Sequence, residues 1–274
     1  MLTFVPTPLG NLRDITYRAV DTLQNATFFL CEDTRVTRRL LNLLYDRGVL
    51  ERLPEAEFLS FNEHNGLQRL GEIGTRISEE QTVYVSDAGM PAISDPGQLL
   101  VTYCQERGIS YDVLPGPSAV TTAYAASGFP SGRFLFYGFL PHKGRERREE
   151  LERLLAQEWA TVLYEAPHRM EKLLKEIDER EADRELFAAR ELSKRHQGYY
   201  RGKASELLER LRVEQAFRGE WVVILSPGGG ARPALYLEEI LAEDLPPKIK
   251  AKLLARLSGE SVKNWYQRLL EAKK

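Results

Sequence analysis

The segment of residues 82–97, TVYVSDAGMPAISDPG, constrains the fold of this chain more than any other. A short apolar run leads into a loop that holds two glycines, two prolines and two aspartates, and the helical run LLVTYCQERG follows. In an α/β sheet, ligands bind beyond the carboxyl ends of the strands, where such loops lie. Because a long loop of this composition is costly for folding alone, we interpret it as a loop shaped for a ligand.

The same strand–loop–helix order recurs through the first half of the chain. Residues 16–23 and 34–44 carry apolar side chains at helical spacing. This alternation predicts an α/β fold with a mostly parallel sheet and crossover helices. The order is interrupted at residues 128–132, GFPSG, so a first α/β domain is predicted at 1–128. The predicted strands of this half are residues 2–6, 26–31, 56–60, 82–85 and 111–114.

A second α/β series follows, and a helical region ends the chain. The segments EAPHR (165–169) and RELSKRHQGYYRG (190–202) are interpreted as polar loops, and SPGGGARP (226–233) as a linker. Residues 235–274 have a helical pattern with breaks at 246–247 and 258–259. The apolar stripe of this tail is expected to pack on the body of the protein or on a second subunit. A helix-turn-helix-like contact with RNA is less favoured. We therefore predict a second α/β domain at 129–233 and a helical extension at 234–274. Its predicted strands are 133–138, 160–165, 186–190 and 221–226, with helices at 145–156 and from Arg169.

Composition places the chain among ordinary globular proteins. Of its 274 residues, 43% are hydrophobic and 28% are charged. No apolar run approaches the roughly 18 residues of a membrane span, and the first residues lack the pattern of a signal peptide. Cys31 and Cys104 lie in apolar segments, which favours a reduced, cytoplasmic protein. The two cysteines and four histidines give no metal-ligand spacing, and the net charge of −2 neither implies nor excludes a nucleic-acid partner.

Three loops that follow predicted strands are candidates for ligand binding: residues 6–11, 86–97 and 115–119. None matches GxxxxGK[ST], which disfavours a P-loop, and no GxGxxG follows the first strand. One such loop could be a tight surface turn. Three of them at strand ends predict a cleft for a small polar ligand.

Seven segments resemble, in the same order, those of the ribosomal RNA small subunit methyltransferase I family, a branch of the tetrapyrrole methylase superfamily. The resemblance covers roughly residues 2–225, and its most specific part is SDAGMPAISDPG together with CEDTR. The segments are FVPTPLGNLRDITYRA, CEDTRVTRRLL, SDAGMPAISDPG, LPGPSA, FYGFLP, YEAPHR and ARELSKRH.

The resemblance implies two α/β domains with S-adenosylmethionine in the cleft between them, usually in a homodimer. It further implies methyl transfer to the 2′-hydroxyl of a cytidine in the decoding centre of small-subunit (16S) rRNA, in the assembled or assembling 30S subunit. An alternative is a tetrapyrrole-methylase-like enzyme that methylates a small-molecule or protein substrate, and another is a non-catalytic RNA-binding assembly factor. Basic clusters at the cleft mouth would favour RNA, whereas an enclosed apolar pocket would favour a small molecule.

The resemblance also implies which residues contact the cofactor. The first loop would contribute Pro8, the third would close the side near the methionine part, and the second domain would contact the adenosine. The chain departs from the small-molecule methylases at Met90, where they carry an aspartate. The implied residues are Pro8, Asp87, Gly89, Pro91, Ile93, Ser118, Ala119, Glu165 and Leu192.

Methyl transfer to a hydroxyl requires alignment of oxygen and sulfur, and a base that accepts the proton helps further. Three residues are ranked as acid/base candidates without a choice among them: Asp33, Glu63 and Lys194. Asp33 could instead cap a helix, and Lys194 could belong to a solvated charged turn. Substrate contacts are expected from Arg35, His64, Arg190 and Arg195.

Basic residues that could contact RNA phosphates occur in four clusters. For the cluster at 143–148, the acidic neighbours favour a solvated helix instead. The clusters are Arg35, Arg38 and Arg39; Lys143, Arg145, Arg147 and Arg148; Lys194, Arg195, Arg201 and Lys203; and Lys248, Lys250 and Lys252.

Overall fold

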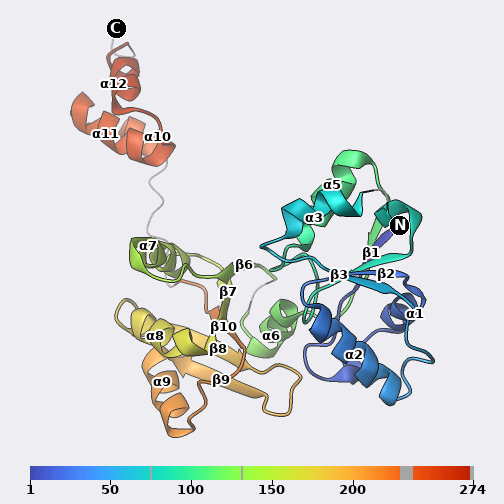
Figure 1. The fold of residues 1–274 in the computed structure, drawn as a ribbon. Coiled ribbons are helices and arrows are strands. Elements are labelled where there is room, and N and C mark those ends of the chain that lie inside the picture. The colour runs from blue at the N-terminus through green and yellow to red at the C-terminus, as the bar shows by residue number, and fades with distance from the viewer. Residues whose placement is uncertain (75, 131, 229–236, 272–274) are drawn as a thin grey trace. The chain divides into compact units, whose positions relative to one another are not determined.

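The computed structural model describes residues 1–74, 76–130, 132–228 and 237–271. Its first sheet is parallel throughout and has the strand order β3-β2-β4-β1-β5, as Figure 1 shows. The strands are β1 (Leu2–Phe4), β2 (Phe28–Cys31), β3 (Glu57–Ser60), β4 (Thr82–Val85) and β5 (Tyr111–Val113). The predicted parallel sheet with crossover helices is confirmed.

Helices cover both faces of this sheet (Figure 1), because alternate side chains of its buried strands point to opposite sides. On one face, Phe29 and Val83 pack with residues of α1 (Tyr17–Asn25) and α2 (Thr34–Asp46). On the other face, Phe28 and Tyr84 pack with α3 (Gly66–Ile73), α4 (Arg76–Glu79) and α5 (Gly97–Arg107). A 3-10 turn, η1 (Leu12–Asp14), precedes α1.

The connections that leave β1 and β4, two neighbouring strands of this sheet, run in opposite directions across it. From β1 the chain continues to β2 on one side, and from β4 it continues to β5 on the other. Such a point at the carboxyl ends of parallel strands is where open α/β sheets bind ligands. The loops after β1 and β4 meet there.

The second sheet is mixed and has the order β6-β7-β10-β8-β9, in which β6 and β7 are parallel and the other neighbours are antiparallel. Its strands are β6 (Phe134–Phe139), β7 (Ala160–Glu165), β8 (Glu185–Arg190), β9 (Gly198–Lys203) and β10 (Trp221–Leu225). The interpretation of residues 190–202 as a loop was wrong, because β9 begins at Gly198 and takes up the end of this segment. This edge strand buries Tyr200 while Tyr199 and Arg201 are exposed, so its polar composition hid the strand.

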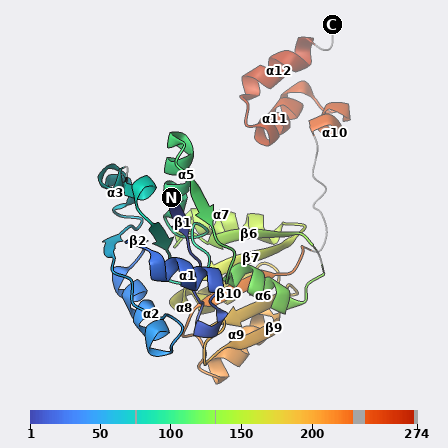
Figure 2. The same ribbon diagram turned by 90° about the vertical axis from the view of Figure 1, so that its right-hand side faces the viewer.

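Helices also cover the second sheet on both faces (Figure 2). Its larger core packs against α7 (Gly144–Leu155), α8 (Pro167–Asp178) and α9 (Ala204–Val213). The opposite face packs against α6 (Ala119–Ser127), through Val120 and Ala123. Both sheets belong to one compact unit, residues 1–228; the predicted boundary at residue 128 stays a prediction.

Residues 229–274 form a second compact unit. Its helices are α10 (Leu237–Ala242), α11 (Pro247–Ser258) and α12 (Val262–Glu271), so both predicted breaks are confirmed. The Trp265 indole donates to Ser258 Oγ at 2.6 Å and ties α12 to the end of α11. Of the predicted linker, residues 226–228 have no regular structure, and 229–233 lie outside the described residues. No helix in the described ranges has the length and apolar character needed to cross a membrane.

Candidate active site

Two adjoining cavities are lined by loops of the first sheet and by residues of the second. The larger has a volume of about 460 Å³, a size typical of small-molecule sites, and the smaller a volume of about 90 Å³. Together we call them the cleft. The residues that line both cavities are Leu9, Glu32, Ala88, Ser94, Ala119 and Tyr164.

An open cavity of about 450 Å³, here called the outer cavity, adjoins the cleft. It shares Ile93, Ser94 and Asp95 with the smaller cavity, and Ser94 and Phe139 with the larger. Ile93 is 44% exposed and Phe139 is 53% exposed. The outer cavity therefore offers an apolar surface that a large substrate can reach from solvent.

The loops after β1 and β4 are joined by backbone hydrogen bonds. The Thr7 N–H donates to the Gly89 carbonyl, and the Gly89 N–H donates to the Thr7 carbonyl, each at 3.0 Å. Gly89 has a φ of +80°, and a Cβ there would lie 2.9 Å from Leu9 Cδ2. Glycine is thus required both by the backbone conformation and by the close approach of Leu9.

Most residues that the resemblance implied for the cofactor do line the cleft. Two do not: Pro8 and Pro91 are buried, and neither lines a cavity of the cleft; Leu9 takes the lining position beside Pro8. Contact with a cofactor stays a prediction for all of them. The residues in the lining are Asp87, Gly89, Ile93, Ser118, Ala119, Glu165 and Leu192.

Asp95 shapes the loop after β4. Its Oδ1 accepts hydrogen bonds from the Tyr84 hydroxyl at 2.8 Å, the Ala92 N–H at 3.0 Å and the Gly97 N–H at 2.8 Å. Ala92 has a φ of +63°, a strained conformation that these bonds stabilise. Asp95 therefore has an architectural role, and Met90, at the position of the missing aspartate, lines the smaller cavity.

Carboxylates at the ends of β2 and β4 form a linked pair. Glu32 Oε2 accepts from the Asp87 N–H, and Asp87 Oδ1 accepts from the Asp33 N–H, both at 3.1 Å. Burial raises the pKa of Glu32, and the charges of Asp87, Asp95 and Glu63 raise it further. The pKa of Asp87 is raised as well, first by burial and then by the charge of Asp33.

Asp33, the first predicted base, caps α2 and pairs with Arg35. Its side chain accepts from the Arg35 N–H at 2.8 Å, and the Arg35 guanidinium donates to both carboxylate oxygens. These bonds lower the pKa of Asp33 to about 2. Such a weak base is a poor proton acceptor, and the same pairing occupies the guanidinium predicted to contact substrate.

Lys194, the second predicted base, is held as an ammonium ion. Its Nζ donates to Glu191 Oε1 at 3.0 Å and to Glu220 Oε2 at 2.9 Å. Burial alone lowers the pKa of Lys194, but the two carboxylates outweigh burial and raise it. Lys194 therefore suits an electrostatic role, and Gly10 packs directly against it.

The remaining predicted residues lie around the cleft rather than in it. Glu63 lines the outer cavity, and His64 is exposed beside it at the start of α3. Arg190 Nε donates to the Arg218 carbonyl at 2.6 Å. Arg195 is exposed and has no ion-pair partner in the part of the chain that the structure describes.

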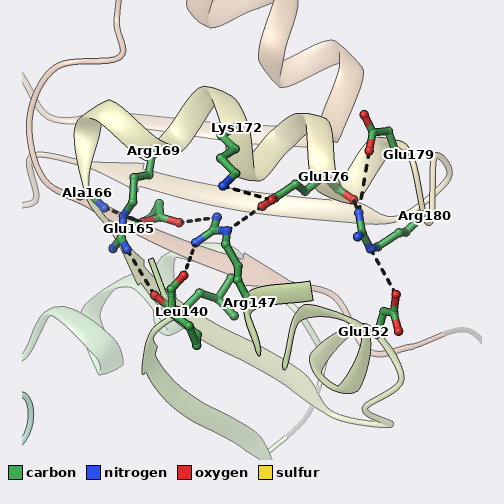
Figure 3. Close-up of polar contacts among 11 residues, drawn as sticks. Leu140, Arg147, Glu152, Glu165, Ala166, Arg169, Lys172, Glu176, Glu179 and Arg180 are labelled. Carbon is green, nitrogen blue, oxygen red and sulfur yellow. Dashed lines mark hydrogen bonds and ion pairs between the residues drawn. The ribbon is translucent and has the colours of Figure 1, made fainter. Parts of the chain in front are cut away.

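Glu165 lies at the end of β7 in a buried ionic network (Figure 3). The Arg147 guanidinium lies 3.1 Å from Glu165 Oε2 and 2.8 Å from Glu176 Oε2, while Arg169 Nε lies 2.7 Å from Glu165 Oε1. Arg147 is 1% exposed, so the interpretation of residues 143–148 as a solvated cluster was wrong for Arg147. This network fixes the start of α8, where Pro167 lines the larger cavity.

Sequence reasoning did not single out several residues of the cleft. Glu32 was seen only within the CEDTR motif, and Leu9 and Tyr164 only within longer segments. Glu32 directly follows β2, Leu9 lies in the loop after β1, and Tyr164 is the last residue but one of β7. A rule that favours the first polar residue after a buried strand could have selected Glu32.

Comparisons with known proteins agree with this architecture. A family model described as Tetrapyrrole (Corrin/Porphyrin) Methylases matches residues 1–208. A Helicobacter pylori (strain ATCC 700392 / 26695) protein named Ribosomal RNA small subunit methyltransferase I is 44% identical over 100% of this chain and 99% of its own length. A Thermotoga maritima protein of the same name is 46% identical over 82% of this chain and 97% of its own length.

A solved structure of uroporphyrin-III C-methyl transferase from Thermus thermophilus, complexed with S-adenyl homocysteine, has a TM-score of 0.54 and 15% identity, covering 82% of this chain and 96% of that chain. At this identity the likeness concerns the fold. The family model and the full-length relative go further. The chain belongs to the tetrapyrrole methylase family and, within it, to the ribosomal RNA small subunit methyltransferase I group.

Proposed function

We propose that this protein transfers a methyl group from S-adenosylmethionine to the 2′-hydroxyl of a cytidine in the decoding centre of small-subunit (16S) rRNA. The observation that carries the proposal is the cleft, which joins the loops after β1 and β4 to the second sheet and opens to the outer cavity. The relatives named Ribosomal RNA small subunit methyltransferase I support the rRNA substrate. The cytidine and its 2′-hydroxyl rest on the sequence resemblance.

The residues of the cleft fit S-adenosylmethionine. Ser86 Oγ is buried in the lining without a hydrogen-bond partner among the described residues, and the Ser118 side chain caps none of the N–H groups of α6. Both hydroxyls can bind a polar ligand. The Asp87 carboxylate complements the positive charge of a sulfonium or an ammonium group, and Ala189, Leu192 and Val222 give an apolar wall for the adenine.

When bound, S-adenosylmethionine supplies an electrophilic methyl group. The chain aligns the two reactants: Leu9 and Tyr164 line both cavities of the cleft, and the backbone bonds between Thr7 and Gly89 hold the two loops in place. Alignment of this kind can supply much of the reduction in barrier. Of the predicted substrate contacts, Arg195 and His64 are exposed for RNA, whereas Arg35 and Arg190 are engaged by Asp33 and by a carbonyl.

The outer cavity favours a large substrate over a small one. Its apolar residues Ile93 and Phe139 are open to solvent rather than enclosed, unlike the buried pockets that hold small molecules. A small-molecule or protein substrate remains the alternative function. We further propose that the protein works as a homodimer in the cytoplasm, where small ribosomal subunits are assembled.

The decisive experiment measures transfer of labelled methyl from S-adenosylmethionine to small ribosomal subunits that lack their natural modifications, followed by nuclease mapping. Base-resistant label on the ribose of one cytidine is the expected result. If the protein binds S-adenosylmethionine but transfers no label to the RNA, the result would instead favour a small-molecule or protein substrate.

The cofactor site has its own test. The double variant Asp87→Ala/Ser118→Ala removes a carboxylate and a hydroxyl from the lining, so S-adenosylmethionine should bind about tenfold or more weakly, as loss of one charged or two neutral hydrogen bonds predicts. Calorimetry measures the affinity, and circular dichroism checks the fold. An unchanged affinity would refute the assignment of the cleft.

A further inference from the structure

Glu32 combines position and chemistry in a way that no other residue of the cleft does. Among the described residues that line both cavities, it alone carries a carboxylate. A ligand that extends through both cavities therefore passes Glu32. The Oε2 atom of Glu32 accepts from the Asp87 N–H, whereas Oε1 makes no hydrogen bond within the described ranges and is free to accept a proton.

The other polar residues shared by the two cavities do not suit this task. Burial, followed by the charge of Glu220, raises the pKa of Tyr164 to about 12, so its hydroxyl stays protonated at neutral pH. Ser94 offers an alcohol, which is a far weaker base than a carboxylate. Leu9, Ala88 and Ala119 have no ionisable group.

The three bases suggested by the sequence are less well placed. The ion pair with Arg35 lowers the pKa of Asp33 to about 2, and Lys194 has no free electron pair while its ammonium is held by two glutamates. Glu63 lines the outer cavity and neither cavity of the cleft. Glu32 is thus the carboxylate best placed to meet a hydroxyl that enters from the outer cavity.

The surroundings of Glu32 adjust its basicity in the useful direction. Burial raises its pKa, and the carboxylates of Asp87, Asp95 and Glu63 face it from the neighbouring loops and raise it further. The hydrogen bond from the Asp87 N–H acts in the opposite direction, and the hydroxyl of Tyr84, which also faces Glu32, is tied to Asp95. A proton acceptor works best when its pKa lies near the working pH.

We propose that Glu32 is the catalytic base of the methyl transfer proposed above, on which this role rests. The substrate hydroxyl oxygen forms a bond to the methyl carbon while the carbon–sulfur bond breaks and its electron pair stays on sulfur. The hydroxyl proton moves to Glu32 Oε1 and leaves to water after the product departs. The neutral thioether and the methylated ribose are the products, so charge and atoms balance.

The test compares Glu32→Gln, Glu32→Asp and the wild type in single-turnover methylation of unmodified small ribosomal subunits at saturating S-adenosylmethionine. Gln keeps the acceptor for the Asp87 N–H and removes the base, so its rate should fall by about 10²–10⁴-fold, while Asp restores part of it. The wild-type rate should fall as the pH is lowered through the pKa of Glu32, and Gln should abolish this limb. Glu106→Gln, exposed on α5 and outside all three cavities, is the matched control.

Calorimetry on the same variants separates catalysis from cofactor binding. The dissociation constant for S-adenosylmethionine should change less than about threefold in Glu32→Gln. A rate within about threefold of the wild type, or a loss that comes from weaker cofactor binding alone, would overturn the role of Glu32 while the proposed function stands. A wild type that binds the cofactor and methylates no rRNA would overturn the proposed function and this role with it.

Discussion

At the scale of single residues, Glu32 and Asp87 are carboxylates in a place that does not favour their charge. Burial raises the pKa of each, so the folded state binds their protons more tightly than the unfolded chain does. Stability is therefore lost as the pH rises through these raised values. A site that keeps such groups gives up stability for chemistry.

Glu32→Gln should accordingly stabilise the protein while it inactivates it. Below the unfolded pKa of about 4.3, Glu32 is neutral in the folded and in the unfolded state, so the variant is no more stable than the wild type. Above the raised folded pKa, the free energy of unfolding of the variant should exceed that of the wild type by at most about 1 kcal/mol, since the partly exposed group is screened by solvent. Urea unfolding at pH 4 and pH 8 measures the difference. Equal stability of variant and wild type at pH 8 would show that the charge of Glu32 does not destabilise the fold.

Asp33 offers a second prediction, which separates capping from catalysis. Asn caps a helix as well as Asp does, whereas Ala does not. Asp33→Asn should keep both melting temperature and methylation rate, and Asp33→Ala should lower the melting temperature by roughly 2–4 °C, as loss of a cap in a protein of this size implies. A large loss of methylation rate in Asp33→Asn, with an unchanged melting temperature, would instead indicate that Asp33 acts as a catalytic base.

At the scale of elements, the buried network of Arg147, Glu165 and Arg169 joins α7, β7 and α8. Removal of one member leaves buried charge without a partner. Arg147→Met should therefore destabilise the protein by about 3–5 kcal/mol, measured by chemical denaturation. Arg145→Met on the same helix, whose side chain is 84% exposed, is the control and should leave unfolding unchanged; equal effects of the two would contradict the buried pairing.

The elements that the sequence predicted best are those with unambiguous ends. Residues 82–85 and 160–165 were predicted to the residue, because each apolar run stops at a polar or proline-containing segment. β9 was missed because an edge strand with one exposed face reads as a polar loop. Arg147 was misjudged because helical periodicity does not reveal that a charged side chain will meet Glu165 from a distant strand.

The candidate site divides in the same way. The loops around Gly89 and Ser118 could be recognised because glycine, proline and capping residues mark them locally. The environment of Glu32 could not, because its raised pKa depends on the pairing of β2 with β4, which brings Asp87 beside it. Sequence reasoning found the loops of the site, and tertiary contacts decided what each carboxylate in them can do.

At the scale of the whole molecule, residues 1–228 and 229–274 form separate compact units. The Thermotoga maritima relative matches 82% of this chain with 97% of its own length. A variant that ends at Gly228 should keep its melting temperature within about 2 °C and its affinity for S-adenosylmethionine within about twofold, because each unit has its own core. Scanning calorimetry and ligand titration measure both, and a collapse of either would show that the helical unit supports the cleft.

The packing of helix α6 determines how residues 1–228 should unfold. The helix follows the last strand of the first sheet in the chain, yet Val120 and Ala123 are buried against the second sheet. The first sheet alone would end in a helix with a bare apolar face, and the second alone would lack one of its covers. The two sheets should therefore melt together in a single calorimetric transition. When the chain is divided after residue 128, each half alone should aggregate, and the two halves refolded together should form the folded unit.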